Sequence, residues 1–173
     1  MPRARLIKTS DGIGQALNAF IQRGKTVQAY LNRKAYRQYQ SAQKERWQSE
    51  NTSETGQWAP LSTKPFFAYW EDPPVYVDGG YAEYKKIKYA EFPGGGNALM
   101  IATGKLSQAA MGRGDGKLKV ITNNKMTVGI DDGAIPYGKW AAEARPFMHF
   151  GPTTIQKITG DLARWLIEGG DLD

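Results

Sequence analysis

The hydrophobic positions in the first third of the chain repeat at intervals of three and four residues. This stripe is made by Ile13, Leu17, Phe20, Ile21, Val27, Leu31 and Ala35. The spacing places these side chains on one face of an α-helix, and Ser10 or Asp11 is a suitable N-cap. A looser continuation through Tyr39, Ala42 and Trp47 extends the predicted helix to about residue 48. Such a helix would be about 55 Å long, so it would protrude or pack against another chain.

A single glycine near the middle of this stripe leaves two arrangements open. Glycine inside a helix costs about 1 kcal/mol relative to alanine, so Gly24 can bend or interrupt the helix. The pattern therefore fits either one long helix or two shorter helices that pack against each other.

The periodic pattern is lost after the predicted helix. Residues 51 to 65 have the composition of a loop. Three of these residues form an apolar hook: Trp58, Pro60 and Leu61. Residues 66 to 96 are rich in aromatic side chains but interrupted by Pro and Gly, and they predict only short extended pieces at residues 75 to 77 and 88 to 92.

The second half of the chain gives clearer patterns. Residues 98 to 102 predict a buried strand, and after Gly104 residues 105 to 111 predict a helical turn. Residues 117 to 122 and 126 to 130 alternate with period two and flank Asn123-Asn124, which predicts a β-hairpin. A final helix is predicted from one apolar face that ends before Gly169-Gly170 and contains Ile155, Ile158, Leu162 and Trp165 or Leu166.

The order of these elements predicts an α+β fold, with a small antiparallel sheet packed against helices. At 173 residues, 40% of them hydrophobic, the chain can bury one ordinary core. We therefore expect a single domain over residues 1 to 173. Residues 1 to 50 would be an extended helical N-terminal region and residues 51 to 173 an α+β core.

The positive charge of the chain is concentrated near its N-terminus. The net charge is +6, and residues 1 to 50 hold ten Lys or Arg against three acids, which leaves about −1 for the rest. We take the following residues as candidate contacts to DNA or to another subunit: Arg23, Lys25, Arg33, Lys34, Arg37, Lys44 and Arg46. A solvated helix face is the alternative. The neighbouring Tyr30, Tyr36, Tyr39 and Trp47 fit either a base-stacking surface or packing against protein.

Few residues of the chain suit catalysis. It has no cysteine, and His149 is its single histidine, with no nucleophile or orienting acid near it in sequence. The acidic pairs Glu71-Asp72 and Asp131-Asp132 adjoin Pro or Gly, where Asp commonly forms turns rather than cation sites. The Arg-Gly-Asp tripeptide of residues 113 to 115 is interpreted as chance. We therefore expect no enzyme, no cofactor and no metal. The lack of a long apolar run or a secretory signal favours a soluble protein made in the cytoplasm.

Four segments in a fixed order carry a family resemblance. They are WAPLS (residues 58 to 62), MIATGKLSQA (100 to 109), TVGI (127 to 130) and IPYGKWAAEARPFM (135 to 148), and a terminal amphipathic helix follows them. In this order the chain resembles the phage virion morphogenesis family, which contains tail-completion proteins of Mu-like and related tailed bacteriophages. The structural residues of the resemblance are Trp58, Pro60, Leu61, Thr103, Gly104, Leu106, Gly129, Tyr137, Arg145, Pro146 and Phe147.

The resemblance implies a structural role in a virion. Such proteins complete or terminate the tail, or join it to the head, as a homo-oligomeric ring around the DNA channel of the neck, here expected to be a hexamer. The implied partners are other copies of the chain, tail tube or sheath proteins, head connector or stopper proteins and DNA passing through the channel, with no membrane. The protein would be assembled in the host bacterial cytoplasm. The alternative hypothesis is a basic nucleic-acid-binding module.

Within this picture Arg145-Pro146-Phe147 has roles that follow from its residue types. Pro146 favours an extended backbone at the residue before it, and Phe147 is expected to anchor in the core. Arg145 would pair either with Glu143 or across a subunit boundary.

Overall fold

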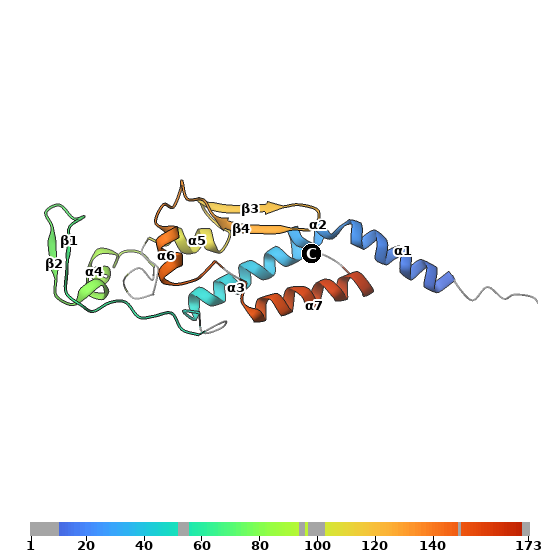
Figure 1. Cartoon of the computed structure of the whole chain (residues 1–173), viewed down its shortest axis with the longest axis horizontal. Helices are drawn as coiled ribbons and strands as arrows, with labels where there is room; N and C mark the ends of the chain where they lie inside the picture. Colours follow the sequence, from blue (N-terminus) through green and yellow to red (C-terminus); the bar gives the residue numbers. More distant parts are fainter. Residues whose placement is uncertain (1–10, 52–55, 94–95, 97–102, 149, 171–173) are drawn as a thin grey trace, which may run out of the picture.

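The computed structural model of the chain describes residues 11–51, 56–93, 96, 103–148 and 150–170. The helices are α1 (Asp11–Lys25), α2 (Val27–Tyr30), a π-helical segment (Leu31–Ala35), α3 (Tyr36–Gln48), α4 (Gly80–Lys88), α5 (Lys105–Ala110), α6 (Gly138–Ala144) and α7 (Pro152–Glu168). The strands are β1 (Phe66–Ala68), β2 (Val75–Val77), β3 (Lys117–Ile121) and β4 (Met126–Ile130). The predicted α+β class is confirmed. The molecule is elongated, with α1 at one end and the β1–β2 hairpin at the other (Figure 1).

The predicted N-terminal helix is present as a nearly continuous series from Asp11 to Gln48. Its direction changes around α2, so that α1 and α3 slope differently (Figure 1). Gly24 lies inside α1, and the break is at Thr26, whose backbone N–H donates to the Arg23 carbonyl over 2.9 Å. The Thr26 hydroxyl donates to the same carbonyl over 3.1 Å. The expected bend is therefore made by this threonine, because its side chain competes for the helix carbonyls.

The C-terminal helix α7 packs along both α1 and α3 (Figure 1). Its contact centres on Trp165, whose ring lies 5.3 Å from that of Tyr30 between centroids. Ile158 and Leu162 pack on the same cluster, as the periodicity predicts. Ile155 is 49% exposed, so its predicted place on the buried face is wrong. The helix ends at Gly169, which has a φ of +81°, and this confirms the predicted stop.

A second and larger core joins α3 to the middle and C-terminal parts of the chain. Its buried members are Trp47, Trp58, Leu106, Ala109, Ala110, Ile135 and Phe147. The predicted hairpin of β3 and β4 is confirmed, with an antiparallel register that places Leu118 opposite Gly129. It packs beside α5 and continues along α2 (Figure 1). The predicted strand at residues 98 to 102 lies outside the described residues, as does His149.

The third hydrophobic cluster lies at the end of the molecule opposite α1 (Figure 1), within residues 66 to 96, for which the sequence predicted few elements. The predicted extended piece at residues 75 to 77 is confirmed as β2, which pairs antiparallel with β1. The predicted extended piece at residues 88 to 92 is wrong, because Lys88 ends helix α4 and turns follow it. Burial of Tyr84 against Ala68 and Val77 fixes this helix on the hairpin. We call β1, β2 and α4 together the tip.

Candidate assembly interface

The basic side chains of the N-terminal helices divide into structural and exposed groups. Arg23 lies against the end of α7, where its Nε donates to the Leu166 carbonyl and its Nη2 to the Ile167 carbonyl, both over 2.8 Å. Cations stabilise a helix C-terminus, because the last carbonyls are not paired within the helix. Arg23 is therefore a clasp between α1 and α7.

Arg46 is also structural, since its side chain is 1% exposed and its Nη1 donates to the Phe147 carbonyl over 2.8 Å. Burial therefore removes it from the expected contacts to DNA or to another subunit. Four of the other candidate side chains are exposed, and Lys34 is half-buried. The exposed ones are Lys25, Arg33, Arg37 and Lys44. These four are the part of the predicted basic surface that can meet a partner.

The aromatic side chains that accompany these cations face the protein interior. Tyr30 and Tyr39 are 0% and 2% exposed, and Tyr36 and Trp47 are also buried. The Tyr39 hydroxyl donates to the Ala110 carbonyl over 2.6 Å, and burial raises the pKa of Tyr39. The hypothesis of a base-stacking surface on this helix is therefore wrong, because no ring of this set is open to a base.

The residues of the family resemblance come together around the larger core. The Trp58 ring meets Trp47 edge-on at 5.3 Å, and its Nε1 donates to the Pro146 carbonyl over 3.3 Å. Arg145 donates to the carbonyls of Ala59 and Pro60 over 2.9 and 3.0 Å, which joins the last segment to the first. The extended backbone of Arg145 and the burial of Phe147 confirm two expectations.

The other residues of this set are placed in the same region. Leu106 is buried and Leu61 packs on the core, while Thr103 and Tyr137 are exposed and Gly129 pairs within the hairpin. Gly104 has a φ of +83° at the start of α5, the left-handed conformation that favours glycine. Most of these residues thus build the subunit, while the last segment also exposes Tyr137 and Trp140.

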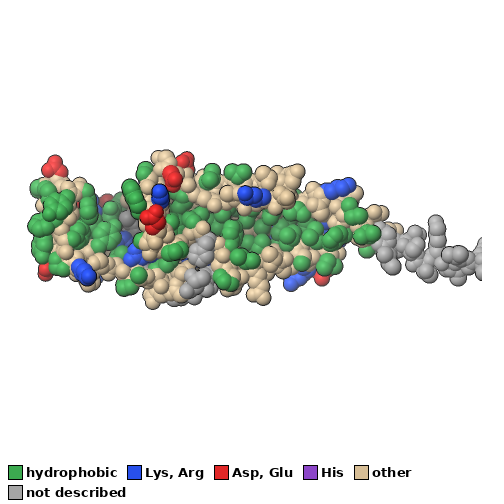
Figure 2. Space-filling model, in the orientation of Figure 1, with side chains coloured by type: hydrophobic (Ala, Val, Ile, Leu, Met, Phe, Trp, Pro, Cys, Tyr) green, Lys and Arg blue, Asp and Glu red, His purple; other side chains and the backbone are tan. Residues whose placement is uncertain are grey.

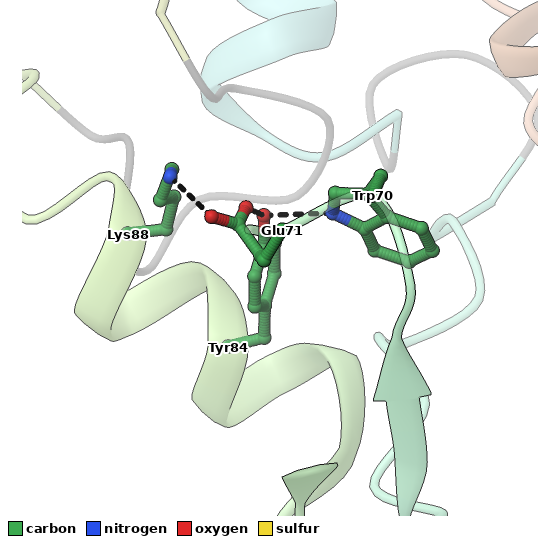
Figure 3. Close-up of polar contacts among 4 residues, drawn as sticks. All are labelled: Trp70, Glu71, Tyr84 and Lys88. Carbon is green, nitrogen blue, oxygen red and sulfur yellow. Dashed lines mark hydrogen bonds and ion pairs between the residues drawn. The ribbon is translucent and has the colours of Figure 1, made fainter. Parts of the chain in front are cut away.

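A polar network fixes the tip internally. Tyr84 donates to one oxygen of the Glu71 carboxylate over 2.5 Å, and Lys88 contacts the other over 2.7 Å (Figure 3). Trp70 donates to the Tyr84 hydroxyl over 2.9 Å. The hydrogen bonds from Lys88 and Tyr84 lower the pKa of Glu71, and burial followed by the bond to Glu71 raises the pKa of Tyr84 to about 12. Glu71 therefore belongs to the scaffold of the tip.

The outer side of the tip is an aromatic face. Phe67 and Tyr76 lie opposite each other in the hairpin with ring centroids 5.0 Å apart, and Tyr69 stacks on Phe67 at 5.6 Å. The three rings are 48%, 54% and 75% exposed, respectively. Figure 2 shows hydrophobic side chains gathered at this end, with acidic side chains at its upper and lower edges. We call Phe67, Tyr69 and Tyr76 the tip face.

The opposite end of the molecule carries a second exposed apolar surface. Leu17, Phe20 and Ile21 of α1 are 57%, 43% and 44% exposed. Residues four apart share a helix face, so Leu17, Ile21 and the exposed Lys25 follow one another along α1. We call these four residues the α1 stripe. The two apolar surfaces thus lie at the two ends of the molecule.

The acidic residues Asp131 and Asp132 lie at a turn. Asp131 accepts a hydrogen bond from the Gly133 backbone over 2.9 Å, which confirms its predicted role in a turn. Within the described ranges no cluster of three metal-ligating His, Cys, Asp or Glu residues occurs. Among the same residues, no helix combines the length and the hydrophobicity that crossing a bilayer requires.

Sequence reasoning did not find Lys85, which is 2% exposed beside a 460 Å³ hollow lined also by Tyr81, Tyr89, Tyr137 and Arg145. Burial, reinforced by the charge of Arg145, lowers the pKa of Lys85 to about 8. A basic residue within the short α4 segment gives no sequence signal of burial.

Comparison with known proteins adds no relative to this description. No family model matches the chain, and neither a curated protein nor a solved structure matches it.

Proposed function

We propose that the protein is a non-enzymatic structural component of a tailed bacteriophage that completes the tail or joins it to the head. In this proposal copies of the chain form a ring around the DNA channel of the virion neck, bounded by tail tube or sheath proteins and by the head connector. The phage assignment rests on the ordered sequence segments, and the assembly role rests on the surface of the subunit.

One observation carries the assembly role: large apolar side chains are exposed at both ends of an elongated subunit. The tip face and the α1 stripe alone leave six such side chains between 43% and 75% exposed. Monomeric proteins expose few contiguous apolar patches, and larger ones mark interaction sites. Surfaces at two opposite ends suit a subunit that meets two neighbours.

The exposed cations support the part of the proposal that concerns DNA. Arg37 and Lys44 are seven residues apart on α3 and therefore lie on one face of it. Both are exposed. Such charges attract phosphate without reading sequence, as a channel for passing DNA requires.

The test is the mass of the purified chain by size-exclusion chromatography with light scattering, before and after addition of tail tubes from a lysate made without this protein. We expect a discrete ring, or a monomer that binds tube ends at a fixed copy number. A chain that stays at 19.2 kDa and ignores tube ends would refute the proposal.

The same preparation tests the second candidate, a basic nucleic-acid-binding module, which the four exposed cations favour. Binding through these four charges would give a slope of about −3 to −4 for log K against log salt. A monomer with this salt dependence and no affinity for tube ends would establish the module in place of the ring.

A further inference from the structure

We infer that the protein assembles head to tail, with the tip face of one copy seated on the α1 stripe of the next. This inference rests on the proposed homo-oligomeric assembly and specifies the two surfaces that make it. The occupant of each surface is therefore a second copy of this chain.

The tip face has the size and chemistry of an interaction site. At about 200 Å² per aromatic residue, its three exposed rings present roughly 350 Å². This is comparable with the largest apolar patch on a typical monomer, which is often functional. The polar network of Glu71 with Tyr84 and Lys88 lies between β1 and α4, so the face is supported from behind (Figure 3). Aromatic rings on a rigid support are typical anchors of protein interfaces.

Charge helps to decide which surface of a second copy the tip face meets. The hairpin segment from residue 64 to 79 contains three acids, Glu71, Asp72 and Asp78, and one cation, Lys64, while α4 adds Glu83 and three lysines, Lys85, Lys86 and Lys88. Two of these acids serve the tip itself, because Glu71 binds Tyr84 and Lys88 and Glu83 accepts from the Gly79 backbone over 2.7 Å. The other two, Asp72 and Asp78, are exposed at the ends of the β1–β2 hairpin. The exposed charges on the hairpin segment are therefore these two acids and Lys64, a net charge of −1.

The α1 stripe has the complementary character. Residues 12 to 44 contain no Asp or Glu, and Lys25 is exposed one turn after Ile21 on the same side of the helix. A contact of a tip with a stripe brings Asp72 or Asp78 towards Lys25, whereas a contact of two tips offers these acids no cation other than Lys64. Opposite charges across an interface favour it, so we pair the tip with the stripe.

The geometry of the molecule agrees with this pairing. The two surfaces lie at opposite ends of the long axis (Figure 1). A subunit with different surfaces at its two ends makes heterologous contacts, which generate closed rings or open filaments. Each copy then contacts one neighbour through its tip face and the other neighbour through its α1 stripe.

Two substitutions, one on each surface, test the inference. Tyr76→Asp places a carboxylate on the tip face, and Phe20→Asp places one in the α1 stripe. Ile155→Asp is the matched control, because Ile155 is 49% exposed on α7 outside both surfaces. The assay is light scattering under the conditions in which the unaltered chain assembles, with circular dichroism to confirm folding.

We expect each interface variant alone to remain at the monomer mass, with a rise in the apparent Kd of about thirtyfold or more. The control should assemble as the unaltered chain does. Mixing the two variants should then give a species of twice 19.2 kDa, because the intact tip of one can bind the intact stripe of the other. No larger species should form, since both remaining surfaces of that pair are blocked.

The outcomes separate this inference from the proposed function. Assembly of both variants in the manner of the unaltered chain would overturn the head-to-tail contact and leave the ring protein standing. Variants that fail alone and also fail in the mixture would overturn it in favour of symmetric contacts. Failure of the unaltered chain to assemble by itself or on tube ends would instead remove the proposed function.

A charge exchange tests the pairing without the apolar substitutions. Lys25→Glu should weaken assembly, and so should the double change Asp72→Lys with Asp78→Lys. Combining all three changes in one chain should restore assembly, because opposite charges face each other again. An additive loss in the combined variant would contradict the proposed contact.

Discussion

Arg23 offers a direct test of whether the basic helix is built for partners or for its own fold. Replacing it by glutamine removes the positive charge and the two hydrogen bonds to the carbonyls of Leu166 and Ile167. Each bond contributes about 0.5–1.5 kcal/mol, with the lower value for the exposed one. The cation at the end of α7 adds about 0.3–1 kcal/mol. Together these contributions give about 2 kcal/mol, which corresponds to a factor of roughly thirty in the equilibrium for detaching α1 from α7.

The assay is hydrogen exchange of the backbone amides of α1 and of the last turns of α7. In Arg23→Gln we expect these amides to exchange up to about thirty times faster, with little change in the larger core, because elements can open locally. Lys25→Gln is the control, since it removes an equal charge from an exposed position two residues away. Arg23→Lys should be intermediate, because lysine keeps the charge but lacks the planar fork. Equal protection in Arg23→Gln and Lys25→Gln would refute the clasp.

Three further predictions concern the core, the tip and the buried lysine. Phe147→Ala should lower the free energy of unfolding by about 3–5 kcal/mol, because this ring is buried in the larger core. Phe67→Ala removes an exposed ring and should change it by less than about 1 kcal/mol. Similar shifts of the melting temperature in the two variants would refute the assignment of Phe147 to the core. Gly80→Ala would place a Cβ atom 2.5 Å from the backbone of the loop before β1. It should therefore destabilise the protein more than Gly104→Ala, because Gly104 also has a positive φ but has open space around its Cβ position. Urea unfolding measures both variants, and equal losses of stability would contradict this prediction. Relative to Lys85→Met, the unaltered chain should gain about 2 kcal/mol of stability between pH 7 and pH 10. The pKa of Lys85 in the folded state, about 8, lies below the ordinary value of 10.5, so the unfolded state binds more protons in this pH range. A stability difference between the two proteins that does not change with pH would refute the pKa shift.

The spacing of hydrophobic residues predicted the positions of α7, β3 and β4. Leu162 and Trp165 recur at helical spacing and face the same cluster, and the alternation in β3 and β4 matches their pairing. In α7 one side of the helix meets the core and the other meets water, whereas in β3 the apolar Leu118 and Val120 are 45% and 49% exposed, so alternation predicted the pairing of this strand but not its burial.

The tip could not be predicted in this way because apolar residues occupy both of its sides. Phe66 packs toward Tyr84 while its neighbour Phe67 is 48% exposed, so hydrophobicity does not distinguish the inner side of β1 from the outer one. In α4 the exposed Ile87 and the buried Lys85 invert the usual pattern. An aromatic strand that is apolar on both sides is itself the signal that could have indicated an interface.

The roles of Arg23 and Arg46 were equally hidden in the sequence. Both stand among other cations on the predicted basic helix, and nothing local separates them from the exposed Arg37. Their partners, Leu166 and Phe147, lie more than a hundred positions further along the chain. The distinction between structural and exposed cations therefore arises only with the tertiary fold.

The turn at Thr26 has a consequence for the number of copies in an assembly. In a head-to-tail ring, the direction of α1 relative to the tip of the same subunit fixes the angle through which each copy is rotated from its neighbour. Six copies close at about 60° per step and seven at about 51°, so a small change of direction alters the count. Thr26 lies between α1 and the rest of the chain, and its hydroxyl holds the Arg23 carbonyl. The stoichiometry of such a ring would thus be encoded in one turn of backbone, directly after the α1 stripe and far from the tip face.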